Sequence, residues 1–75
     1  MDANEDAFYA AVGARIYAER RKRKWKQAQL AQPVGVHRNT VGCWERAQRR
    51  IQLYELLAVA KALGVAHFVL LPRED

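Results

Sequence analysis

Two neighbouring residues, Arg38 and Asn39, carry side chains that can hydrogen-bond to the edges of DNA bases. An arginine guanidinium can donate two parallel hydrogen bonds to guanine, and an asparagine amide can pair with adenine through one donor and one acceptor. Each such two-bond pair discriminates against a wrong base by about 1–3 kcal/mol. At the start of an exposed helix, the two side chains would therefore be candidates for reading a duplex.

These two residues lie in a strongly basic part of the chain. Residues 15–50 contain eleven lysines and arginines against two acids, a net charge of +9, whereas residues 1–14 and 51–75 carry −3 and −1. Such a field attracts nucleic acid or another anionic surface. Charge alone does not choose between these partners.

Catalysis and metal binding have little support in the sequence. His37 and His67 lie thirty residues apart, without a cysteine or carboxylate at metal-ligand spacing, so we expect no metal and no cofactor. A nucleophilic Cys43 would need a base and an orienting group, and His37 is nearly two helical turns away at a different angle. We expect a binding protein and not an enzyme.

The length and composition indicate one folded domain. The chain has 75 residues, of which 51% are hydrophobic and 28% charged. Its longest apolar stretches, at residues 56–60 and 62–71, are far below the roughly 18 residues that a membrane span needs. The acidic N-terminus is unlike a signal peptide, and a lone cysteine suits a reducing compartment. We therefore expect a cytoplasmic protein without membrane contact.

Hydrophobic periodicity predicts helices along the chain and no strand. Phe8, Val12 and Ile16 recur at four-residue spacing and predict a long amphipathic helix with these three residues facing inward. Val41 and Trp44 lie three apart and form the apolar seam of a shorter one. The expected helices cover residues 6–24, 27–32, 38–46, 53–63 and, as a last turn or two, 66–71.

The order of these elements and residues resembles the Cro and phage-repressor type of helix-turn-helix. The similarity covers about residues 12–71, and it rests on Arg20, Gln27, Leu30-Ala31, Gly35-Val36, Val41, Trp44-Glu45, Leu53, Leu57, Ala60, Leu63-Gly64-Val65 and Leu70-Leu71. It implies an all-α, compact five-helix, lambda-repressor-like DNA-binding domain spanning residues 1–75, with the helix-turn-helix at about 27–46. It also implies a prokaryotic or phage origin.

Helical angles and the resemblance together indicate the site. With Val41 toward the core, the outward face of the third helix and its start carry the candidate base-reading residues Arg38, Asn39, His37, Gly42 and Cys43. Gly42 either allows close approach of DNA or backbone, or has no special role. The candidate phosphate contacts are Gln27, Thr40, Arg46, Arg49, Arg50 and Lys26. The resemblance further implies a partly buried, structural ion pair between Arg20 and Glu45.

Several positions depart from the family pattern. The residues expected before three of the helices are Lys26, His37 and Gln52 instead of serine or threonine, so we expect weak N-terminal caps. Pro33 should disturb the end of the second helix, because proline has no backbone N–H. Ala47 stands where the family usually has glycine.

The C-terminal segment predicts a protein partner. Phe68 and Val69 stand where the family usually has acidic residues, and exposed apolar clusters mark interfaces. We expect self-association through Phe68, Val69, Val65 and Leu71, within a segment at about residues 65–72. The alternative is that Phe68 folds back over Tyr54 or Leu57. The acidic segment from Asp2 to Asp6 is expected either to be a leader or to favour the start of the first helix.

These features predict a homodimeric transcriptional regulator, a repressor or controller protein, that binds a palindromic site on double-stranded DNA. One alternative is an antitoxin that binds a toxin protein and also regulates its own operon. Another is non-specific compaction of nucleic acid, which would show strong salt dependence and no preferred sequence.

Overall fold

The computed structural model describes residues 3–73, and every regular element in that range is helical. The elements are α1 (Ala3–Lys22), α2 (Gln27–Val34), α3 (Arg38–Glu45), α4 (Leu53–Leu63) and η1 (His67–Leu70). The predicted all-α class is confirmed. The fifth helix is a correction, because η1 is a single 3₁₀ turn and not an α-helix.

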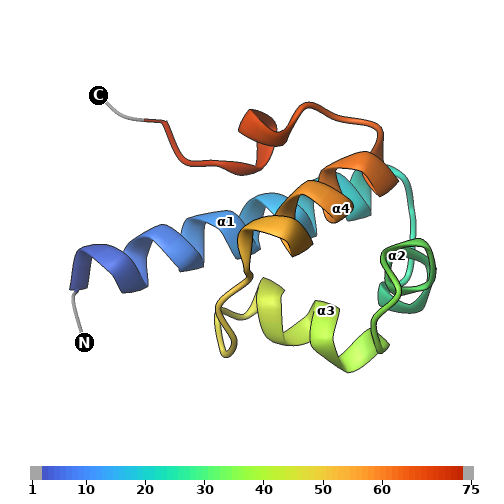
Figure 1. Cartoon of the computed structure of the whole chain (residues 1–75), viewed down its shortest axis with the longest axis horizontal. Coiled ribbons are helices and arrows are strands. Elements are labelled where there is room, and N and C mark those ends of the chain that lie inside the picture. The colour runs from blue at the N-terminus through green and yellow to red at the C-terminus, as the bar shows by residue number, and fades with distance from the viewer. Residues whose placement is uncertain (1–2, 74–75) are drawn as a thin grey trace.

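The elements surround one core, with α3 and η1 on opposite sides of it. In Figure 1, α1 and α4 cross the middle of the molecule, α3 lies below them and η1 above, and α2 stands at the end near the start of α3. Both α2 and η1 pack against α4, while α3 packs against α1 and α2. The outer face of α3 is therefore left without a covering element within residues 3–73.

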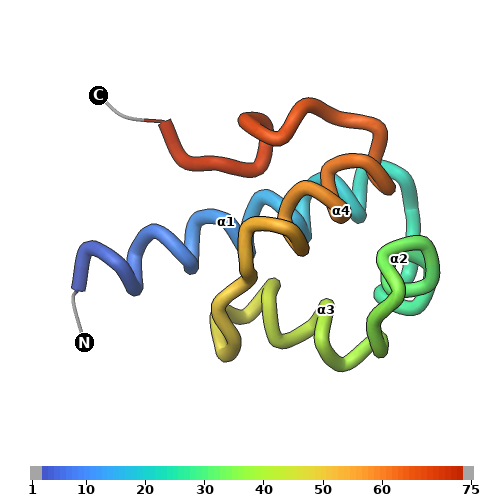
Figure 2. The backbone as a smooth tube through the Cα atoms, in the orientation of Figure 1, coloured from blue at the N-terminus to red at the C-terminus, as the bar shows by residue number. Residues whose placement is uncertain are grey.

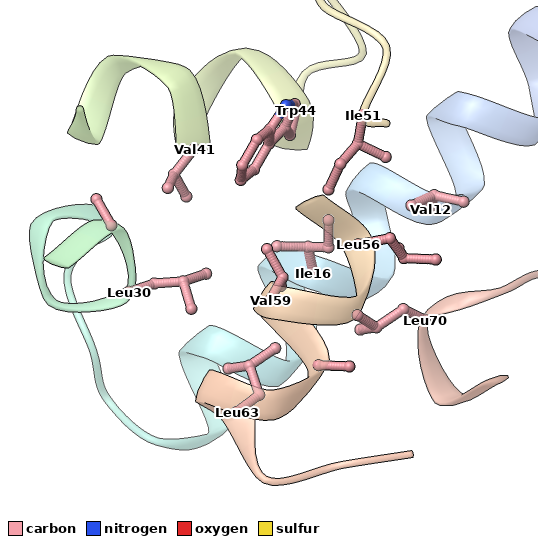
Figure 3. Packing of buried hydrophobic residues seen from close by; sticks show 12 residues of the cluster. Val12, Ile16, Leu30, Val41, Trp44, Ile51, Leu56, Val59, Leu63 and Leu70 are labelled. Carbon is pink, nitrogen blue, oxygen red and sulfur yellow. The ribbon is translucent and has the colours of Figure 1, made fainter. Parts of the chain in front are cut away.

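The core is built from one apolar face of each helix. Figure 3 shows Ile16 of α1, Leu30 of α2 and Val59 of α4 close together, with Trp44 of α3 and Leu70 of η1 closing two sides. These side chains are almost fully buried. No helix within residues 3–73 has the length and apolar character that a membrane crossing requires.

Some apolar residues expected to face the core are exposed at its edges. Phe8 is 41% exposed, because it lies near the N-terminal end of α1, beyond most of the elements that cover Val12 and Ile16. On α4, Leu53 and Leu57, two of the apolar residues on which the family resemblance rests, are also exposed. Apolar spacing alone does not tell where a helix leaves the body of the protein.

Two helix ends differ from the prediction. The first helix ends at Lys22 rather than Lys24, because Lys24 takes a left-handed φ of 57°. The second continues through Pro33 to Val34. Pro33 is tolerated because it lies in the last turn, where its missing N–H removes one bond, and because its φ suits a helix. Gly35, at φ 84°, then ends the helix and donates its N–H to the Ala31 carbonyl.

The N-terminal cap of α3 is better than the sequence predicted, whereas α2 and α4 have no side-chain cap hydrogen bond. The His37 Nδ1 accepts a hydrogen bond of 3.0 Å from the backbone N–H of Asn39, which serves the start of α3. At α2, the backbone N–H of Lys26 donates to Gln29 Oε1 at 2.7 Å. At α4, the backbone N–H of Gln52 donates to Glu55 Oε1 at 2.9 Å. At α2 and α4 the third helical residue thus accepts from the backbone N–H of the capping position, which is one half of a capping box.

Ala47, which follows α3, has a left-handed φ of 56°. This conformation explains why glycine suits the position, since a left-handed residue with a Cβ costs roughly 1–2 kcal/mol. With alanine at this position, the turn that follows α3 is less stable than it would be with glycine.

Gly13 marks the closest approach of α1 to α3. A Cβ built on Gly13 would lie 2.3 Å from the Trp44 carbonyl oxygen and 2.8 Å from that of Glu45. Both contacts are with backbone atoms, which cannot rotate away as a side chain can. The absence of a side chain at Gly13 therefore sets how closely the end of α3 sits against α1.

Candidate nucleic-acid interface

The α2-turn-α3 unit holds the predicted site. Leu30 and Ala31 of α2 and Val41 and Trp44 of α3 are buried together, so the two short helices are fixed to each other and to the core. Figure 2 follows the backbone through the tight turn between them and, after α3, through the loop at residues 46–52 into α4. The outer face of α3 and the start of α2 are thus held by a rigid frame.

The start of α3 presents the two leading base-reading candidates. Arg38 and Asn39 are both exposed, and no side-chain bond of either is found within residues 3–73. His37 is exposed too, but its Nδ1 is used as the helix cap. Cys43 is half-buried and has a free thiol. Arg38 and Asn39 therefore keep all their side-chain hydrogen-bonding groups available for a ligand.

Gly42 is a correction to the predicted base-reading set. It is buried, although it belongs to the outward side of α3. A Cβ built on Gly42 would meet Arg46 Nη1 at 3.0 Å and the amide of Gln27 at 3.1 and 3.3 Å. The neighbours that approach Gly42 closely are protein side chains, so it offers no surface for a base.

The candidate phosphate contacts lie at the start of α2, on α3 and in the loop that follows α3. Gln27 is half-buried at the first position of α2, where the helix also has free backbone N–H groups that favour an anion. Lys26, Arg46 and Arg49 are exposed, and Thr40 is half-buried. Arg46 donates from Nε to Gln48 Oε1 at 3.3 Å, and its Nη1 lies 3.0 Å from the position of a Cβ on Gly42.

Arg50 differs from the other candidate phosphate contacts, because it has ionic partners within the protein. Its guanidinium forms ion pairs with Glu5 and, at 3.2 Å, with Asp6, both in the first turn of α1. It also lies over the ring of Tyr9, 5.2 Å from the centroid. A phosphate would have to compete with two carboxylates for this side chain. The carboxylates of Glu5 and Asp6 tie the start of α1 to the loop after α3, whereas Asp2 lies outside the described residues.

The structure brings together Arg20 and Glu45, the residues expected to form an ion pair. Arg20 Nε donates to Glu45 Oε2 at 2.7 Å and Nη2 donates to Oε1 at 3.0 Å, with side chains only 6% and 3% exposed. Arg20 Nη1 also donates to the Trp25 carbonyl at 2.6 Å. The hydrogen bonds that Arg20 donates to Glu45 raise the pKa of Arg20 above its ordinary value, so the guanidinium stays charged.

A third residue joins this pair and links it to the candidate interface. Gln27 Nε2 donates to Glu45 Oε1 at 3.1 Å. Glu45 therefore connects α1, the end of α3 and the first residue of α2. The sequence pattern indicated the pair but not the amide, because nothing in residue spacing tells that α2 begins beside the end of α3.

The C-terminal segment presents an apolar surface away from α3. Phe68 is 67% exposed and Val69 is 36% exposed, while Val65 and Leu71 are half-buried. The Phe68 ring contacts His67 edge to face, at a centroid distance of 5.9 Å. The alternative in which Phe68 folds back into the monomer core is wrong, because most of its ring is open to solvent.

Comparison with known proteins supports the same helix-turn-helix arrangement. The family described as "Helix-turn-helix" matches residues 16–70. Repressor protein C2 of Salmonella phage P22 is 42% identical over 52 residues, which are 69% of this chain and 24% of that protein. The chain thus spans about a quarter of the length of this curated relative.

Two solved structures share the fold. The P22 c2 repressor in complex with a synthetic operator superposes with a TM-score of 0.76 and 38% identity, covering 84% of this chain and 96% of that one. The restriction-modification controller protein C.AhdI from Aeromonas hydrophila gives a TM-score of 0.80 and 32% identity, covering 83% and 94%. With its buried helix-turn-helix seam and the family match over most of its length, the chain belongs to the helix-turn-helix family.

Proposed function

We propose that this protein is a sequence-specific transcriptional regulator, a repressor or controller, that binds double-stranded DNA as a homodimer on a palindromic site. The observation that carries the proposal is the uncovered outer face of α3, at whose start the side chains of Arg38 and Asn39 have no partner within residues 3–73. The relatives that share this frame include a repressor crystallised with operator DNA and a controller protein. The antitoxin alternative gains no support from these relatives, so only the regulator is proposed.

In this proposal α3 enters the major groove and the basic residues hold it there. Arg38 and Asn39 project from the first turn of α3, the part of a recognition helix that meets base edges. Gln27, Lys26 and Arg49 lie on either side of that turn along the chain and contact the phosphates. The net charge of +9 over residues 15–50 supplies the attraction to the duplex. The chain acts by binding, without a catalytic step.

The proposal predicts different effects for two exposed arginines. Arg38→Ala should cost about 1–3 kcal/mol on the preferred site and relax the preference at one base position. Arg49→Ala should instead weaken binding to all duplexes alike and flatten the salt dependence of the binding constant by about one unit of slope. Fluorescence anisotropy titrations on the preferred site, its single-base variants and an unrelated duplex measure both effects.

Arg49→Ala is the matched control for Arg38→Ala, because both changes remove one exposed guanidinium from the same surface. Equal losses on every duplex for Arg38→Ala would show that Arg38 contacts only phosphates. An unchanged salt slope for Arg49→Ala would remove Arg49 from the phosphate contacts.

We propose that two copies associate through the apolar surface formed by Phe68, Val69, Val65 and Leu71. A domain of this size reads only half a site, and a two-fold dimer places two recognition helices about one helical turn apart on DNA. Phe68 has the largest exposed apolar side chain of these four. It is the residue expected to contribute most to the contact.

Phe68→Ala should weaken the dimer about tenfold or more, because a two-fold contact loses the side chain on both sides. Sedimentation equilibrium over a range of concentrations measures the change. Tyr17→Ala, which truncates an exposed aromatic residue on α1, is the control and should leave association unchanged. If Phe68→Ala dimerises as the wild type does, the contact lies elsewhere.

A further inference from the structure

One residue of α3 is buried on the side of the helix that otherwise faces outward. Gly42 has no side chain, and the ends of two other side chains occupy the space that a side chain would take. The position of a Cβ on Gly42 lies 3.1 Å from Gln27 Nε2 and 3.0 Å from Arg46 Nη1. These contacts are tighter than a real Cβ normally makes, so an added methyl group would push both side chains outward.

The Gln27 amide that lies over Gly42 has a defined orientation. A carboxylate only accepts hydrogen bonds, so the group facing Glu45 Oε1 at 3.1 Å must be the amide nitrogen. Glu45 is itself fixed by two hydrogen bonds from Arg20, at 2.7 and 3.0 Å. One N–H of the Gln27 amide is therefore used inside the protein, while its second N–H and its oxygen have no partner within residues 3–73.

Arg46 reaches the same place from the other end of α3. Its Nε donates to Gln48 Oε1 at 3.3 Å, while its Nη1 comes to within 3.0 Å of the Cβ position on Gly42. One polar side chain from the start of α2 and one cationic side chain from the end of α3 thus meet across a single residue. Both belong to the candidate phosphate contacts.

We propose that Gly42 is a positioning residue, whose missing side chain lets Gln27 and Arg46 lie across the outer face of α3 as a preset DNA contact. The inference rests on the proposed function, since it assigns a role within the same interface. Gly42 acts through these two side chains and does not itself touch DNA. Glycine is less stable than alanine in a helix interior. At this position the helix is therefore less stable than it would be with alanine, and the two side chains keep their place.

The free protein tests the packing part of the inference. Nuclear Overhauser contacts should connect the Gln27 side-chain amide protons to the Hα protons of Gly42. In Gly42→Ala the Gln27 amide resonances should shift, while the melting temperature stays equal or rises, because alanine favours the helix more than glycine does. Absence of the Gln27–Gly42 contact in the wild type would overturn the inference before any DNA is added.

DNA binding tests the positioning part. On the preferred duplex, Gly42→Ala should bind about threefold to tenfold more weakly, the range expected for misplacing a hydrogen-bonded contact. In a Gln27→Ala/Arg46→Ala background, measured at lower salt, the same change should have no further effect. This background is the matched control, because the two side chains that Gly42 accommodates are gone.

Two results in the DNA titrations would overturn the positioning role. An unchanged Kd for Gly42→Ala on the preferred duplex would mean that the two side chains need no such space. A loss that persists at full size in the double-alanine background would mean that the added methyl meets DNA directly. A wild-type protein that binds no duplex would instead overturn the proposed function, while the spectra of the free protein still decide the packing around Gly42.

Discussion

Replacing Glu45 with alanine lowers the free energy of unfolding by about 3–5 kcal/mol, because it leaves the buried Arg20 guanidinium without its counter-charge. Of the acceptors that Arg20 now uses, only the Trp25 carbonyl would remain. A chain of this length has a total stability of about 4–11 kcal/mol, so the change removes a large share of it. Urea denaturation followed by circular dichroism measures the loss.

A paired substitution separates the charge from the packing. In the Arg20→Met/Glu45→Met protein both charges are gone and two apolar side chains fill much of the space, so most of the lost stability should return. A loss below about 1 kcal/mol for Glu45→Ala would be that of a solvated surface pair, and it would contradict the burial of these side chains.

Gly13→Ala should be the second damaging change, with a loss of about 2–3 kcal/mol. The new Cβ would stand 2.3 Å from the Trp44 carbonyl oxygen, so α1 and the end of α3 would have to move apart. That movement would also stretch the bonds between Arg20 and Glu45, which join the same two helices. Thermal and urea unfolding measure the loss of stability.

The control for Gly13→Ala is the opposite exchange at an exposed position of α1. Ala18→Gly changes only helix propensity and should cost about 1 kcal/mol. In the absence of a steric conflict, Gly13→Ala would be expected to gain about that amount. A Gly13→Ala protein more stable than the wild type would therefore contradict the close contact of α1 with α3.

The helices could be predicted because the sequence patterns that mark them are local. The bounds of α4 agree with the prediction at both ends, since a dense apolar face runs up to Gly64, which takes a left-handed φ of 73°. The continuation of α2 through Pro33 could not be predicted in the same way. Whether the last turn tolerates a missing N–H depends on how the helix is held by its tertiary contacts, which the local sequence does not contain.

The site could be predicted in part, for a similar reason. Angles around α3 and the family resemblance identify Arg38 and Asn39 as exposed, because both depend on one helix and its register. Contacts between distant segments were missed, and the ion pairs from Arg50 to Glu5 and Asp6 join residues more than forty positions apart. The buried position of Gly42 was missed as well, since it follows from side chains on α2 and beyond α3.

The central claim is that this domain reads a sequence on duplex DNA as a two-fold dimer. Selection of bound duplexes from a random pool by the purified protein, near physiological salt and followed by sequencing, tests that claim most directly. The account predicts enrichment of an inverted repeat whose half-site centres lie about ten base pairs apart. Folded, soluble protein that enriches no sequence, or only an isolated half-site, would contradict it.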